Sequence, residues 1–140
     1  LVIPYHNNDG ALHVARAISA DSPSWTLQAV STFTGTESDP ESTTANLGAV
    51  VAHGTIIHAF WPDFTTIDIW QDNDQGSGTW QTDVEWKDAV SCRAISIGLF
   101  IYQGSTYVGI LYDDGGVVQF DRFLLRAAAA HRMHLLGVGR

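Results

Sequence analysis

The chain is short of cysteine, of basic residues and of long apolar runs, and each shortage removes a class of protein. Of its 140 residues only Cys92 is a cysteine, which excludes an intrachain disulfide and a zinc site built from cysteines. Lys and Arg together number 7 against 15 acidic residues, so the net charge is −8. Because phosphate binding needs clustered basic side chains, we expect no nucleic-acid partner. No apolar run approaches the length of a membrane helix, so we expect no membrane insertion.

What the chain does contain indicates a folded, all-β domain that spans residues 1–140. Hydrophobic residues make up 45% of the chain and charged residues 16%, a balance typical of globular proteins. Thirteen glycines indicate many turns. Apolar alternation bounded by turn residues predicts strands at 1–5, 11–18, 25–34, 47–53, 55–61, 65–71, 79–86, 94–102, 106–112 and 116–121. Short strands at this spacing favour antiparallel sheets.

One unit of sequence occurs twice and is partly present a third time. Residues 54–61 and 104–111 both open with Gly and continue as an apolar strand, and they start 50 positions apart. In each copy a turn and a second alternating strand follow, at 67–70 and at 117–120. Residues 1–15 fit the later part of the same unit. A period of this length made of short strands predicts four-stranded blades of a β-propeller, about two and a half to three of them in this chain.

That number of blades is too small for a closed ring, which generally needs roughly four to eight. The sheets at the two ends of such a stack would each leave an apolar face in water. We therefore expect the chain to assemble with copies of itself, as a homo-oligomer, or with a complementary chain.

The segment at 122–136 departs from the strand pattern. It is rich in Leu, Ala and Arg, which are strong helix formers, and Gly137 stands where a helix would end. The pattern therefore predicts a short C-terminal helix. A second interpretation makes residues 134–139 a closing strand, because they are similar to the small-residue strand at 47–54.

The unit resembles a blade of the fungal fucose-binding lectins, a family of six-bladed propellers that also includes short bacterial chains that assemble rings. The small-residue strand and its Gly match residues 49–54, and the middle strands match 56–60 and 107–111. The family's Asn/Asp turn matches residues 8–10, and its Gly-rich turn ending in Trp matches 76–80, with Trp25 as the equivalent in the first unit. The resemblance implies a propeller that binds sugars without enzymatic activity.

The residues that grip the sugar in that family are only partly present. There an Arg on the middle strand and a Glu on the next strand hold the sugar hydroxyls, and a Trp stacks on the ring. Val2, Ile56 and Tyr107 stand at the Arg positions, and Val14, Asp68 and Gln119 stand at the Glu positions. The forked donor of the family is therefore missing from its expected places, which weakens the case for fucose itself.

The leading hypothesis is a multivalent, lectin-like carbohydrate-binding module. Trp25 and Trp80 are the candidate stacking plates, Asp68 and Gln119 the candidate hydroxyl acceptors, and Tyr107 a candidate donor. The alternatives are a structural or protein-interaction β domain that binds no sugar, and a glycoside hydrolase built around Asp68. We predict no catalytic residue and no cofactor.

Other chemistry-bearing residues favour structural roles. Trp61 and Trp70 lie inside strands and are expected to fill the core, and Cys92 is expected to be a buried, inert thiol. Residues 72–78 carry several oxygen ligands, but their spacing does not fit a calcium loop, and a solvated hairpin is the better interpretation. The six histidines show no spacing typical of a metal site, so no metal is predicted.

Overall fold

The computed structural model describes residues 1–6, 12–17, 24–30, 48–63, 68–76, 79–92 and 94–126. In these ranges the chain forms ten strands and no helix. The described residues therefore contain no helix long and apolar enough to cross a membrane. The strands are β1 (Val2–His6), β2 (Leu12–Ala17), β3 (Trp25–Ala29), β4 (Ala49–His53), β5 (Ile56–Asp63), β6 (Asp68–Asn73), β7 (Val84–Lys87), β8 (Ile95–Tyr102), β9 (Ser105–Asp114) and β10 (Val117–Arg126). Each of them overlaps a strand predicted from the sequence. The all-β prediction is confirmed.

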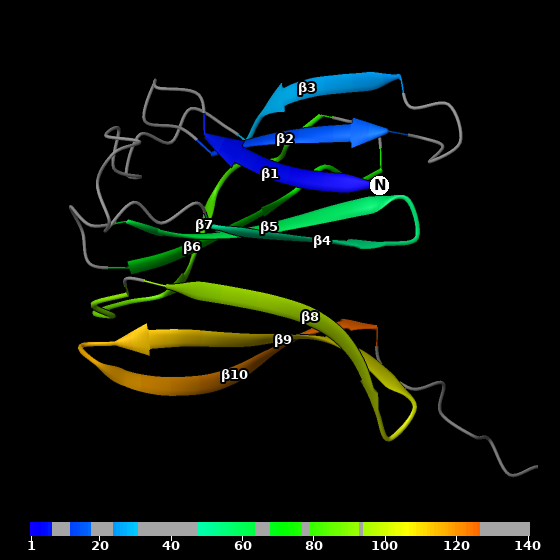
Figure 1. The fold of residues 1–140 in the computed structure, drawn as a ribbon. Helices are drawn as coiled ribbons and strands as arrows, with labels where there is room; N and C mark the ends of the chain where they lie inside the picture. Colours follow the sequence, from blue (N-terminus) through cyan, green and yellow to red (C-terminus); the bar gives the residue numbers. More distant parts are fainter. Residues whose placement is uncertain are drawn as a thin grey trace, which may run out of the picture.

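The strands form three open antiparallel sheets, each of which follows the chain from one strand to its neighbour. The first sheet is β1-β2-β3, the middle sheet is β4-β5-β6-β7 and the third sheet is β8-β9-β10. Figure 1 shows the sheets as three stacked layers, with the middle sheet between the other two. The opening strand of the middle sheet, β4, contacts the opening strands of the other two sheets, β1 on one side and β8 on the other. The three sheets are therefore stacked with their opening strands next to one another.

Two apolar layers hold the stack together, one on each side of the middle sheet. Side chains alternate along a strand, so β5 directs Ile57 and Trp61 to one side and Phe60 to the other. The layer toward the first sheet contains Leu12, Val14, Val30, Ile57, Ala59 and Trp61. The layer toward the third sheet contains Phe60, Ile69, Val90, Cys92, Val108, Ile110 and Tyr112. Trp61 is buried and Trp70 packs on the first of these layers, which confirms the core role predicted for both.

The entry into the middle sheet depends on a glycine. Gly48 precedes β4 with a φ of +66°, in the left-handed region that side chains disfavour. A Cβ atom at this position would lie 2.8 Å from the carbonyl oxygen of Phe60 and 2.9 Å from Cβ of Trp61. The backbone of β4 can approach β5 this closely only because residue 48 carries no side chain.

The predicted helix at 122–136 is wrong where it overlaps the described residues. Strand β10 continues to Arg126 and pairs with β9 as far as Thr106. Phe123 and Leu125 pack against the layer between the middle and third sheets, so tertiary burial overrides the helix propensity of the sequence. Residues 127–136 lie outside the described part of the chain, as do the alternative closing strand at 134–139 and the predicted turn at 8–10.

Candidate functional site

A cleft of about 220 Å³ opens between the first sheet and the middle sheet. Val2 and Arg16 line it from the first sheet, where they are direct cross-strand partners on β1 and β2. The turn between β4 and β5 and the start of β5 supply Gly54, Thr55 and Ile57. The cleft therefore has an aliphatic wall and a single guanidinium, and it exists only because the two sheets are stacked.

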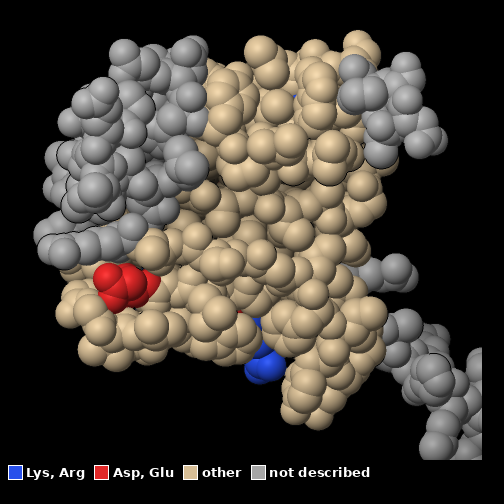
Figure 2. All heavy atoms as spheres, in the orientation of Figure 1, with Lys and Arg blue, Asp and Glu red and all other residues tan. Residues whose placement is uncertain are grey.

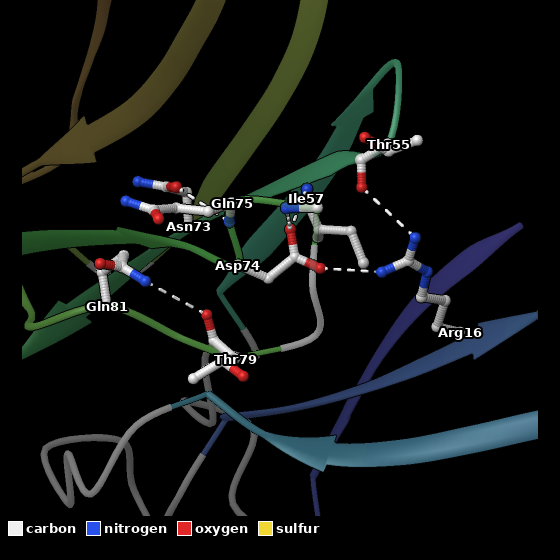
Figure 3. Close-up of polar contacts among 9 residues, drawn as sticks. Arg16, Thr55, Ile57, Asn73, Asp74, Gln75, Thr79 and Gln81 are labelled. Atoms are coloured by element: carbon white, nitrogen blue, oxygen red, sulfur yellow. Dashed lines mark hydrogen bonds and ion pairs between the residues drawn. The ribbon is translucent and has the colours of Figure 1, made fainter.

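Hydrogen bonds fix the guanidinium of Arg16 at the edge of this cleft. Nη1 donates to Oδ2 of Asp74 at 2.9 Å, and Nη2 lies 3.4 Å from the carbonyl oxygen of Thr55. Figure 3 shows the side chain reaching from the first sheet toward both partners. The Arg16 side chain is 25% exposed, whereas that of Asp74 is fully buried. A guanidinium carries five N–H donors, so those not used in these two bonds can meet a ligand in the cleft.

Asp74 organises the turn that follows β6 and also holds Arg16. Its Oδ1 accepts hydrogen bonds from the backbone N–H of Ile57 at 2.8 Å and of Gly76 at 2.9 Å. Its own N–H donates to the carbonyl oxygen of Ile57 at 3.1 Å. Because a buried carboxylate requires such partners, Asp74 locks the turn to β5 and orients the guanidinium at the same time. The sequence predicted a solvated hairpin at residues 72–78, and this is wrong for Asp72 and Asp74, whose side chains are buried.

A second buried carboxylate lies beside the same turn. The pKa of Asp72 is raised from 3.8 to about 6, chiefly by burial. The neighbouring charges of Asp83 and Asp74 contribute to this rise, while hydrogen bonds from the N–H groups of Asn73 and Gln81 oppose it. Those two donors lie 2.6 and 3.1 Å from Oδ1, and Oδ2 is buried with no hydrogen-bond partner in the described structure. In the folded protein Asp72 is therefore mostly protonated below about pH 6 and mostly ionised above it, whereas an ordinary Asp is ionised above about pH 4.

The two predicted stacking plates do not line the cleft. Trp25 pairs with Ala17, next to Arg16 along β2, but alternation places it on the opposite face of the first sheet, where it is 40% exposed. Trp80 packs against the apolar layer between the first and middle sheets, and its Nε1 is buried without an acceptor in the described structure. Of the two, Trp25 is the one with an open ring.

The predicted polar contacts are distributed over two other places. Asp68, the first residue of β6, is buried at 5% exposure. Its carboxylate accepts a hydrogen bond from the N–H of Ala89 at 3.2 Å. Gln119 is exposed on β10, where it pairs with Tyr112. Tyr107 lies on the outer face of the third sheet and stacks on Phe100 with 5.3 Å between ring centroids. The structure does not bring the five predicted residues together within one chain, and their contact with sugar stays a prediction.

A second polar cluster joins the middle and third sheets. Lys87 Nζ donates to the hydroxyl of Tyr112 and, at 2.9 Å, to Oδ2 of Asp121. The hydrogen bonds to Tyr112 and Asp121 raise the pKa of Lys87, and the bond from Lys87 lowers the pKa of Asp121. The ammonium also lies 4.9 Å from the ring centroid of Tyr112 and 5.8 Å from that of Trp86. This cluster fastens the edge strand β7 to the third sheet.

Sequence reasoning missed Arg16, which supplies the guanidinium of the cleft. The comparison with the lectin blade looked for Arg at the position of Val2 and found none. The structure places Arg16 directly across from Val2 on the adjacent strand, in the same layer between sheets. The signal that could have found it was the Asn/Asp turn predicted at 8–10, because antiparallel pairing of the flanking strands sets Val2 opposite Arg16, as the register of β1 and β2 does.

Neither a metal site nor a reactive thiol is found in the described ranges. No group of three or more His, Cys, Asp or Glu side chains gathers there in a way that could hold a metal ion. Cys92 is buried, and burial raises its pKa to about 11, so the thiol is the inert core residue that the sequence predicts. The chemistry available at the Arg16 cleft is therefore hydrogen bonding and apolar contact.

A comparison with protein-family models finds no match to this chain, and comparisons with curated proteins and with solved structures find none either.

Proposed function

We propose that the protein is a multivalent, lectin-like module that binds glycans, with its sheets acting as blades of a propeller-type assembly. The observation that carries this proposal is the position of Arg16, a forked donor held by a buried carboxylate in an inter-sheet cleft beside Val2. The resemblance to fucose-binding blades implies such a donor at the position of Val2, and here Arg16 stands directly across from it on the neighbouring strand.

The form of the cleft suits a single sugar ring. Its volume of about 220 Å³ is below the range of roughly 300–1,000 Å³ typical of sites for drug-sized ligands. Val2 and Ile57 offer an aliphatic wall to the C–H groups of a sugar, and the guanidinium of Arg16 offers donors to its hydroxyl oxygens. A shallow site of this kind binds weakly alone, so repetition in an assembly would supply the avidity.

The stacking of the sheets supports the propeller part of the proposal. The three sheets are stacked with β4 in contact with β1 and with β8, as successive blades around an axis would be. The middle sheet has four strands, the number in a propeller blade, and both of its faces are covered. The first and third sheets have three described strands each.

Glycan arrays followed by calorimetry on the assembled protein test this proposal. Arg16→Lys keeps the positive charge beside Asp74 but removes the forked donor, and we expect it to weaken glycan binding at least tenfold. Thr82→Val, an exposed change outside the cleft, is the matched control and should leave affinity unchanged. Absence of binding to any glycan by the unaltered protein would end the proposal, and an Arg16→Lys variant with full affinity would exclude this cleft.

A second function is favoured by the exposed apolar side chains on the outer sheets. Phe120 and Leu27 are 63% and 64% exposed, which is typical of surfaces that bind another polypeptide. On this alternative the chain is a structural or protein-interaction β domain without a sugar ligand. Native mass spectrometry from the source cells separates the two, because a complex with a different chain supports the alternative and a complex of identical chains supports the lectin.

A further inference from the structure

The outer face of the third sheet is a continuous apolar surface with a hollow in it. Strand register places Ser96, Leu111 and Phe120 in one row, Gly98, Gly109 and Arg122 in the next, and Phe100, Tyr107 and Leu124 in a third. Gly98 lies in the floor of a hollow of about 430 Å³, bounded by Phe100, Leu111 and Phe120. A Cβ atom at Gly98 would have no neighbour within 4 Å, so this floor is open.

The outer face of the first sheet has the opposite relief. Its central strand β2 presents the small residue Ala15, flanked by Ile3 on β1 and Leu27 on β3. Ile3 is 45% exposed and Leu27 is 64% exposed, so they stand above the sheet together with Trp25. This face therefore offers protruding aliphatic side chains, whereas the third sheet offers a hollow lined by aromatic rings.

Charged side chains are few on the described outer face of the third sheet. Two charged side chains of the described strands lie on the outer face of the third sheet. Asp113 is at one end, in the row with Val118. Arg122 is positioned over the rings of Tyr102 and Tyr107, 5.6 and 5.0 Å from their centroids. On the side of the molecule drawn in Figure 2, charged side chains occupy only small parts of the described surface. The register rows themselves are mostly apolar on both outer faces, so a contact between these faces buries apolar surface.

We infer that the outer face of the third sheet binds the outer face of the first sheet of a second copy of this chain, head to tail. The contact continues the packing already present inside the chain, where the first sheet covers one side of the middle sheet and the third sheet covers the other. It places β8 of one copy next to β1 of the following copy, as β4 lies next to β1 and β8 within one chain. Leu27 and Ile3 of one copy enter the hollow above Gly98 of the other.

This inference deepens the assembly part of the proposed function and does not depend on the sugar. A head-to-tail contact uses two different faces, so a chain altered on one face keeps the other intact. A contact between two like faces would behave differently, because a change on the opposite face would not affect it. This difference defines the experiment.

Sedimentation equilibrium of three variants tests the inference. The unaltered chain should have a mass at least twice the 15.2 kDa of one copy. Leu27→Glu, on the first face, and Phe120→Glu, on the third face, should each be monomeric, because each places a charge in the contact. The control Val84→Glu alters a residue that is 51% exposed on β7, away from both faces, and should assemble as the unaltered chain does.

Mixing the two monomeric variants gives the decisive result. The intact third face of Leu27→Glu should bind the intact first face of Phe120→Glu, which yields a complex of one copy of each and no larger species. Formation of this complex also shows that both variants are folded. The inference is overturned if the unaltered chain is a monomer, if either single variant keeps the parent mass, or if the mixture stays monomeric.

Filling the hollow gives an independent check. Gly98→Leu places a side chain where the chain itself has only open space, so the fold tolerates it while the docking site is occupied. We expect the assembly to dissociate at least tenfold more readily. Unchanged assembly by this variant would exclude the hollow as the contact. Sugar binding at the Arg16 cleft is measured separately, so its failure would not be confused with a failure to assemble.

Discussion

Replacing Asp72 with Asn should stabilise the protein at neutral pH and leave it nearly unchanged in mild acid. Asp72 is 1% exposed, and its Oδ2 is buried without a hydrogen-bond partner in the described structure. Asn keeps the Oδ1 acceptor for the N–H groups of Asn73 and Gln81 and removes the negative charge. The substitution therefore imitates the protonated carboxyl, which predominates in the folded protein below about pH 6.

The size of the effect follows from the pKa of Asp72. Its folded pKa of about 6 lies above the ordinary value of 3.8, so between these values the folded state holds a proton that the unfolded state has lost. The free energy of unfolding consequently falls as the pH rises from about 4 to about 6. Since each pKa unit corresponds to about 1.4 kcal/mol, the full loss is about 3 kcal/mol and is complete above pH 6.

Denaturant unfolding, followed by tryptophan fluorescence at equal protein concentration, measures this difference. Asp72→Asn should exceed the unaltered protein by about 1–3 kcal/mol at pH 7.5, and the two should converge near pH 4.5. His58 is common to both proteins, and its pKa is lowered chiefly by burial, so its opposite pH dependence cancels in the comparison. A variant that is less stable by the same amount at both pH values would refute the assignment of a buried, uncompensated charge to Asp72.

Three further predictions concern the frame around the site. Gly48→Ala should lower the free energy of unfolding, measured in thermal or chemical melts, by about 2–4 kcal/mol, because a Cβ atom there would overlap the backbone of Phe60. An unaffected variant would contradict the close approach of β4 to β5. Cys92 should react with a thiol reagent only under denaturing conditions, since its thiol is buried with a pKa of about 11, and fast labelling of the native protein would oppose this. Lys87→Met should lower the free energy of unfolding by less than about 1 kcal/mol, because the ion pair of Lys87 with Asp121 is partly exposed. It should nevertheless increase the rate of amide hydrogen exchange in β7. Unchanged exchange would show that the cluster does not hold this strand.

The strands could be predicted because their signal is local. Alternation and turn residues mark each strand in the sequence itself, and the ten described strands each overlap that pattern. The bounds are less well predicted, since β7 begins only at Val84 within the range predicted at 79–86. The end of β10 shows where this information fails. Residues 123–126 favour a helix by composition, but Phe123 and Leu125 gain more by packing in the layer between the middle and third sheets than the helix would provide.

The site could not be predicted because it depends on which residues face each other across strands and sheets. Arg16 becomes the donor of the cleft only through its register with Val2 and its contact with Asp74, which is 58 positions away in sequence. Asp68 fails as an obvious surface acceptor for a related reason. Alternation placed it opposite Ile69, but in a sheet covered on both sides the opposite face is also buried.

The two proposals meet in a final prediction about valency. Phe120→Glu should separate the assembly into single chains while leaving the Arg16 cleft intact, since the two lie on different sheets. In calorimetry with a soluble monovalent sugar, its affinity per chain should equal that of the unaltered protein. On a surface densely coated with the same sugar, the unaltered assembly should bind roughly 100-fold more tightly than the variant, because linked sites convert later contacts into intramolecular ones. Equal binding of both proteins to the surface would mean that assembly does not serve glycan binding, whereas a loss of affinity in calorimetry would mean that the sugar site is shared between copies.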